Sequence, residues 1–168
     1  TEGAVDEGIR HAITKLSYLH FTSTEAYKNR VIQLGEEPER VFCVGATGIE
    51  NILHETLLSK RDLEDSLEFL LDKPYAVVTF HPVTLEGDNA ATQFEELLVV
   101  CSAHQEMKFI FTKANADAHG RVINKLIDDY VIHHNNAIAV PSLGMVRYLS
   151  AIRHSAMVIG NSSSGIVE

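Results

Sequence analysis

Alternation between short apolar runs and helical segments is the feature that most constrains the fold of this 168-residue chain. Runs rich in Val, Ile and Phe lie at residues 41–44, 76–80, 108–111, 137–140 and 157–159. Each run is short and almost continuously apolar, as parallel strands covered on both faces are. Apolar residues at helical spacing lie between them: Ile9, Ile13 and Leu16; Phe94, Leu97, Leu98 and Cys101; Val122, Ile123, Leu126, Ile127 and Tyr130; Met145, Leu149 and Ile152. This alternation predicts βαβ units, and so an α/β fold with Rossmann-like parallel sheets.

A charged segment divides the chain into two parts. Residues 59–72 are expected to form an exposed helix with Leu63, Leu67, Leu70 and Leu71 turned inward. We therefore assign residues 1–50 to the C-terminal part of one α/β domain, residues 51–72 to a linker and helix, and residues 73–168 to the first part of a second domain. Because Thr1 is not a natural initiator, we expect the chain to be a piece of a larger protein.

The charge of the chain limits the classes of partner it could bind, and its cysteine content indicates the cellular compartment. The chain has 14 basic and 23 acidic residues, a net charge of -9, which argues against binding to nucleic acid or to an anionic membrane. No apolar run approaches the length of a membrane span. Cys43 and Cys101 are far apart in sequence and form no CxxC pair, which favours a reducing cytoplasm over a disulfide framework.

Polar residues follow four consecutive predicted strands. These endings are His81-Pro82, residues 113–117 with Asn115 and Asp117, Pro141-Ser142, and residues 161–164. The carboxyl ends of parallel strands meet at one edge of a sheet, where α/β proteins bind ligands. Four such endings favour a binding site at that edge, although His81 alone could simply cap a strand.

The loop at residues 160–165 predicts an anion site. A Gly/Asn/Ser-rich turn after a buried strand lets backbone N–H groups and the hydroxyls of Ser162 and Ser163 approach a phosphate. A flexible turn without a ligand is the alternative. The nine histidines show no metal-ligand spacing, so we expect no bound metal. The Asp6-Glu7 pair is explained on spacing alone by a helix that starts near Ile9.

Three motifs, taken together, resemble a known family. Residues 1–7 leading into 9–17, residues 80–84 (FHPVT) and residues 160–165 (GNSSSG) look like motifs of the hydrolysing UDP-N-acetylglucosamine 2-epimerases of sialic-acid synthesis, in the expected order. The resemblance covers the whole chain. It implies a GT-B architecture of two Rossmann-like domains, present here only as a fragment. It also implies release of N-acetylmannosamine and UDP through a 2-acetamidoglucal intermediate, without a cofactor.

The resemblance also assigns roles to individual residues. Asp6 takes the place of an acidic residue important for catalysis, and His81 would contact the diphosphate or assist proton transfer. Among the substrate-binding residues, Ser162 and Ser163 would hold the phosphates, Tyr148 would stack on the uracil, and Glu168 would bind the ribose hydroxyls. Asn115 and Asp117 would line the nucleotide pocket.

The same motifs fit other functions. A relative acting on a UDP-diacetamido sugar, or a non-hydrolysing UDP-N-acetylglucosamine 2-epimerase, would share these motifs. A non-catalytic UDP-sugar-binding module is the alternative from another class. The sequence leaves open the exact sugar, assembly into a homo-oligomer, allosteric control and the activity of the fragment itself.

Overall fold

The computed structural model describes residues 5–82, 89–114 and 118–162. The chain forms two compact units, Thr1–His54 (unit 1) and Glu55–Glu168 (unit 2), and each is described by itself. Among the described residues, no helix is both long and apolar enough to cross a membrane.

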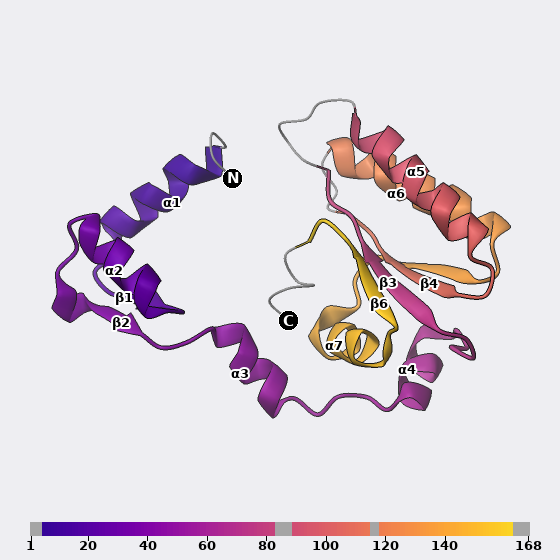
Figure 1. The fold of residues 1–168 in the computed structure, drawn as a ribbon, viewed down its shortest axis with the longest axis horizontal. Coiled ribbons are helices and arrows are strands. Elements are labelled where there is room, and N and C mark those ends of the chain that lie inside the picture. The colour runs from indigo at the N-terminus through magenta and orange to yellow at the C-terminus, as the bar shows by residue number, and fades with distance from the viewer. Residues whose placement is uncertain (1–4, 83–88, 115–117, 163–168) are drawn as a thin grey trace. The chain divides into compact units, whose positions relative to one another are not determined.

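Unit 1 is built on a two-stranded parallel sheet (Figure 1). Its elements are α1 (Val5–Leu16), β1 (His20–Thr22), α2 (Glu25–Gln33), the 3₁₀ helix η1 (Pro38–Arg40), β2 (Val41–Cys43) and α3 (Thr47–His54). Helix α2 packs against both strands, and it begins where the Thr24 hydroxyl accepts a hydrogen bond from the Tyr27 N–H at 3.2 Å. Strand β1 was not predicted, because three residues are too few to show a periodic pattern.

One face of the unit 1 sheet is open to solvent. Phe21 and Phe42 are paired in register and stack with ring centroids 5.7 Å apart, yet they are 65% and 43% exposed. The apolar stripe of α1 is exposed as well, at Ile9, Ile13 and Leu16. The described part of unit 1 therefore leaves apolar surface uncovered on both its sheet and its first helix.

Unit 2 contains a four-stranded, fully parallel sheet in the order β5-β4-β3-β6. Its elements are α4 (Lys60–Leu67), β3 (Tyr75–Thr79), α5 (Asn89–Ala103), β4 (Lys108–Thr112), α6 (Ala118–His133), β5 (Ala137–Val140), α7 (Gly144–His154) and β6 (Met157–Gly160). Each of these four strands overlaps a predicted apolar run. The predicted α/β class with parallel sheets is confirmed.

Two apolar clusters cover the two faces of this sheet. Ala76 and Val78 of β3 pack in one cluster with residues of α5 and α6, including Phe94 and Ile123. Tyr75 and Val77 pack in the other cluster with α4 and α7. Burial raises the pKa of Tyr75 to about 12, with a smaller contribution from Glu64, and its hydroxyl donates to the Ala151 carbonyl of α7 at 2.7 Å. Alternate residues of one strand thus join helices on opposite faces.

Helix α4 is shorter than the sequence suggests. The Ser59 hydroxyl caps its start by accepting from the Asp62 N–H at 3.2 Å, and Leu63 is fully buried. The helix ends at Leu67 because Glu68 takes a left-handed conformation with φ 51°. The turn buries Leu71 but leaves Leu70 exposed, so the expectation that Leu70 points inward was wrong.

Candidate functional site

The strand order of unit 2 creates a topological switch point between β3 and β6. From β3 the chain adds β4 and then β5 on one side, and it then returns to place β6 on the other side of β3. In open α/β sheets the ligand crevice lies beyond the carboxyl ends of the strands at such a point. The candidate site is therefore where β3 ends at Thr79 and β6 ends at Gly160.

A side-chain amide joins the two strand ends beyond the switch point. The His81 N–H donates to Asn161 Oδ1 at 2.8 Å, and Asn161 Nδ2 donates to the His81 carbonyl at 2.6 Å. An amide carries a donor and an acceptor side by side, so Asn161 pairs with the His81 backbone as a neighbouring strand would. We call this pair of hydrogen bonds the Asn161 clamp.

Close approach of β6 to β3 requires a glycine at position 160. Gly160 lies beside Thr79 in the strand register and has a φ of +146°. A Cβ at this position would lie 1.8 Å from the Thr79 carbonyl oxygen. Only glycine fits both this conformation and this contact, so the first residue of the GNSSSG loop has a structural reason to be there.

Two hydroxyls, that of the buried Thr79 and that of the half-buried Thr112, lie next to the switch point. Thr79 of β3 and Thr112 of β4 are neighbours in register, and their hydroxyl oxygens are 2.8 Å apart. The Thr112 hydroxyl also donates to the Val78 carbonyl at 3.3 Å. These side-chain hydrogen bonds join β3 to β4 at their carboxyl ends, close to the point where His81 follows β3.

The end of β4 is held by two further contacts. Lys113 Nζ lies 2.7 Å from a carboxylate oxygen of Asp128. Asn124 of α6 makes an amide clamp of its own, because its Oδ1 accepts from the Ala114 N–H at 2.8 Å and its Nδ2 donates to the Ala114 carbonyl at 3.0 Å. Asn115 and Asp117, the predicted pocket residues that follow, lie outside the described residues.

The connection from β5 to α7 brings a cation to this edge that the sequence analysis did not single out. Arg147 donates from Nε to the Leu143 carbonyl at 2.9 Å and from Nη2 to the Ser142 carbonyl at 3.2 Å. Neither acceptor carries a formal charge.

Tyr148, the residue that follows Arg147, is half-buried and packs against the apolar cluster formed with α4 and α7. Stacking of Tyr148 on a base stays a prediction.

The structure therefore brings some of the predicted site residues together. His81 and Ser162, both half-buried, follow the two strands that flank the switch point. Asp6 lies in the first turn of α1 in unit 1, and its side chain is not described. Ser163 and Glu168 lie outside the described residues. Among the residues that are described, no group of three or more His, Cys, Asp or Glu side chains could hold a metal ion.

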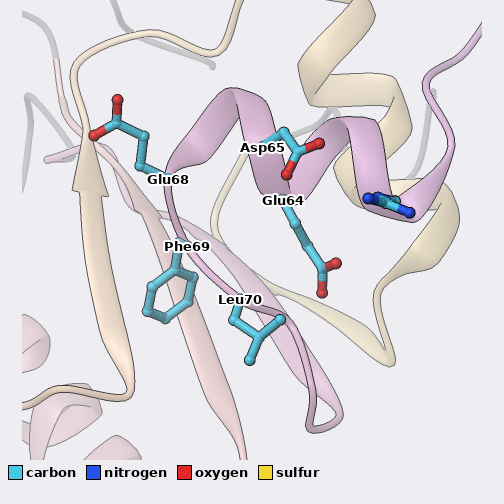
Figure 2. A pocket seen from close by; sticks show the side chains of 6 residues that line it. Glu64, Asp65, Glu68, Phe69 and Leu70 are labelled. Atoms are coloured by element: carbon cyan, nitrogen blue, oxygen red, sulfur yellow. The ribbon is translucent and has the colours of Figure 1, made fainter.

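A hollow of about 590 Å³ lies elsewhere in unit 2 (Figure 2). It is lined by Arg61, Glu64, Asp65, Glu68, Phe69 and Leu70. Lys108, the first residue of β4, lies 4.7 Å from the centre of the Phe69 ring, which places the hollow toward the amino ends of the strands. Three carboxylates in its lining disfavour a phosphate, so we do not assign the substrate to it.

Comparison with known proteins gives a consistent result over the whole chain. Residues 1–168 match the model of the family described as UDP-N-acetylglucosamine 2-epimerase. The chain is 43% identical, over its full length, to a Campylobacter jejuni GDP/UDP-N,N'-diacetylbacillosamine 2-epimerase (hydrolyzing), and covers 44% of that protein. It is 44% identical over 97% of its length to the Escherichia coli polysialic acid biosynthesis protein P7, and covers 41% of it. The chain thus spans less than half the length of these curated relatives.

Solved structures share the fold. A Neisseria meningitidis UDP-GlcNAc 2-epimerase bound to UDP-GlcNAc matches 94% of this chain, with a TM-score of 0.71 and 18% identity, over 43% of its own length. The S. aureus MnaA–UDP co-structure matches 94% of this chain, with a TM-score of 0.70 and 16% identity, over 42% of its length. The chain therefore has the α/β architecture of part of a GT-B epimerase.

Proposed function

Because this chain belongs to the UDP-N-acetylglucosamine 2-epimerase family, we propose that the complete protein containing it is a hydrolysing UDP-sugar 2-epimerase. The observation that carries this proposal within the structure is the switch point of unit 2, where His81 and the Asn161-Ser162 segment follow adjacent strands. Similarity to two relatives named as hydrolysing epimerases, at 43% and 35% identity, supports the same activity.

The proposed reaction needs a base and stabilisation of a leaving diphosphate. A base removes the C2 proton while the C1–O bond breaks, which forms a C1=C2 double bond and releases UDP. Water then adds its oxygen to C1, and a proton returns to C2 from the opposite face. The net change consumes one water and releases UDP and the 2-epimer. Positioned acid–base groups and donors aimed at the leaving oxygens can each lower this barrier.

We assign the diphosphate to the carboxyl edge at the switch point. Ser162 and Ser163 would donate to its oxygens, and His81 would face the leaving phosphate or assist proton transfer. Arg147, whose guanidinium donates to the uncharged carbonyls of Leu143 and Ser142, supplies a nearby positive charge. Asp6 is proposed as a catalytic carboxylate on the strength of its motif. Tyr148, Asn115, Asp117 and Glu168 are proposed to contact the nucleoside.

The relatives favour a diacetamido sugar as substrate. Two proteins similar to this chain are named for N,N'-diacetylbacillosamine, from Campylobacter jejuni and Legionella pneumophila. We therefore propose UDP-N,N'-diacetylbacillosamine as the first substrate. UDP-N-acetylglucosamine is the second candidate, because protein P7 of polysialic acid biosynthesis is 44% identical to the chain.

The test offers both sugars to the complete protein in deuterated water. Free UDP together with a C2-deuterated, epimerised sugar is the expected result, with higher kcat/KM for the diacetamido substrate. A parallel reaction with a GDP-linked diacetamido sugar tests whether the protein prefers uridine or guanosine as the nucleotide. Faster turnover of UDP-N-acetylglucosamine would select the second candidate. If the protein binds either UDP-sugar but releases no UDP and exchanges no proton at C2, it is a non-catalytic UDP-sugar-binding module and the proposed activity is wrong.

The matched variants for this assay separate catalysis from binding. Asp6→Asn should reduce turnover strongly and leave the affinity for UDP nearly unchanged, because it removes a charge without removing the side chain's volume. Ser163→Ala should instead weaken UDP binding by roughly 1–2 kcal/mol, as expected for a hydrogen bond to a charged group. Equal losses of turnover and UDP affinity in Asp6→Asn would indicate a structural role for Asp6.

A further inference from the structure

The backbone of His81 is held from both sides. The ladder between β3 and β6 has its last pair at Thr79 and Gly160, so His81 lies beyond the paired strands. On its amino side, Phe80 packs on Phe94 of α5 with ring centroids 5.3 Å apart. On the other side, the Asn161 clamp occupies both the N–H and the carbonyl of His81. The residue that carries the imidazole is therefore fixed outside the sheet by a side chain.

The clamp requires an amide of this length. Asn161 must accept from one backbone group and donate to another, and the reversed amide would set donor against donor and acceptor against acceptor. Aspartate keeps the acceptor and loses the donor, whereas alanine loses both. Glycine at position 160 brings the Asn161 backbone close enough for this short side chain to reach.

The fold uses the same device on the neighbouring strand for a different residue. Asn124 pairs with both backbone groups of Ala114 after β4, with distances of 2.8 and 3.0 Å. Ala114 has no functional side chain, so that clamp shapes only the path of the chain. The Asn161 clamp holds a residue with an ionisable side chain at the switch point.

We propose that Asn161 is a positioning residue, which fixes the backbone of His81 and thereby aims the imidazole at the reacting diphosphate sugar. This inference rests on the proposed function, in which His81 acts on the substrate. With its backbone fixed, the His81 imidazole has only two side-chain torsions left to search. Small errors in the placement of such a group lower the rate by large factors, of order 10²-fold for about 1 Å.

The experiment is a double-mutant cycle on the complete protein with the UDP-sugar that it turns over. Asn161→Ala should lower kcat by roughly 10- to 100-fold while KM changes by less than about threefold. In a His81→Gln background the same change should lower kcat by less than about twofold, because its target is already gone. Asn161→Asp, which keeps the acceptor for the His81 N–H, provides a second variant should the alanine variant fail to fold.

Asn136→Ala is the matched control for stability. Asn136 is buried at the opposite end of the sheet, where its Nδ2 donates to the Met107 carbonyl at 3.0 Å. If Asn136→Ala lowers the melting temperature about as much as Asn161→Ala does but leaves kcat unchanged, the specific role of Asn161 is supported. Equal kcat losses in both variants, losses that multiply fully with that of His81→Gln, or a KM increase as large as the kcat decrease would overturn it.

A separate readout distinguishes failure of the inference from failure of the proposed function. An inactive wild-type protein, tested on each UDP-sugar, contradicts the proposed function. The His81 imidazole ¹H–¹⁵N signals still report the clamp in that case. A single ring conformation in the wild type that becomes averaged in Asn161→Ala supports positioning by Asn161, and ring signals identical in the two proteins overturn it.

Discussion

Unit 2 covers both faces of its four-stranded sheet with helices, whereas unit 1 leaves Phe21 and Phe42 exposed on one face of a two-stranded sheet. Both sheets are parallel, and parallel strands are normally buried on both sides. The difference shows that unit 2 contains most of a core within this chain, while the described part of unit 1 is one side of a core. The candidate site at the switch point belongs to the unit whose sheet is covered on both faces.

The largest expected difference between the units is in thiol reactivity. Both cysteines are free, but Cys101 of unit 2 is buried, and burial raises its pKa to about 11. Cys43 of unit 1 is only half-buried. At pH 8 only about a thousandth of a thiol with that pKa is ionised, and burial also keeps the reagent away, so Cys43 should react with a disulfide reagent at least about 10² times faster than Cys101. Mass spectrometry of time-resolved labelling measures both rates, and comparable rates would show that unit 2 opens as easily as unit 1.

Truncation of an aromatic side chain should destabilise unit 2 far more than unit 1. Phe111 is fully buried and touches Phe94 and Tyr130, so Phe111→Ala should lower the free energy of unfolding by about 3–5 kcal/mol. Phe42→Ala removes an exposed ring and should cost less than about 1 kcal/mol. Urea unfolding followed by circular dichroism checks both values. A large effect of Phe42→Ala would show that a segment outside the described residues covers that face.

Replacing a glycine by alanine should also destabilise unit 2 more than unit 1, but by a smaller difference. Gly160→Ala places a Cβ against the Thr79 carbonyl, so the β6 backbone must move, at an expected cost of about 2–3 kcal/mol. Gly45→Ala in unit 1 meets no atom within 4 Å and should cost only about 1 kcal/mol for its φ of +84°. Thermal unfolding and the His81 amide shift report the two changes. Equal costs would mean that strain at φ alone, and not the close strand contact, requires Gly160.

Acid should weaken unit 1 before unit 2. The Lys15 hydrogen bond, and more weakly His20, lower the pKa of Glu36 below its ordinary value of 4.5. A carboxyl group whose pKa falls on folding adds stability above pH 4.5, and this stability is lost as the pH falls through the folded-state pKa. In unit 2 the hydrogen bond from Lys108 lowers the pKa of Asp72 in the same way. That unit, however, keeps its apolar core when Asp72 is protonated. Amide signals of unit 1 should therefore lose dispersion first in a titration from pH 6 to 3.

A Glu36→Gln variant is the control for the acid titration. It removes the titrating group and should flatten the pH dependence of unit 1 over this range. If the wild-type and variant titrations coincide, the ion pair with Lys15 contributes nothing to the folded state. Loss of unit 2 signals at the same pH as those of unit 1 would mean that the two units unfold together.

Prediction from sequence worked best where burial on both faces produced a continuous apolar run. The run at 137–140 is β5, the run at 108–111 differs from β4 by one residue at its end, and the run at 76–80 is shifted from β3 by one residue at each end. It failed at β1, which has three residues, and at Leu70, which a left-handed turn at Glu68 redirects toward solvent. The α1 stripe shows the periodicity of a buried helix, yet Leu16 is 87% exposed in the described structure. Periodicity reports that a face is apolar but not what covers it.

For the candidate site, the sequence placed polar residues at the ends of parallel strands, and three motifs indicated the family that the whole-chain match shows. It singled out His81 and the serine loop because small and polar residues after an apolar run are a local signal. It gave no signal for the Asn161 clamp or for the contacts of Arg147, since these join residues up to 80 positions apart or depend on how a loop turns.

The sequence by itself determined the four strands of unit 2 and the helices between them, because local apolar patterns and turn residues act over a few positions. Only the tertiary structure decided that β6 lies beside β3 rather than beside β5, which creates the switch point. That order depends on packing between helices and sheet faces that are distant in sequence. It also explains the glycine in the GNSSSG loop, whose missing side chain lets β6 approach β3 closely enough for Asn161 to hold His81.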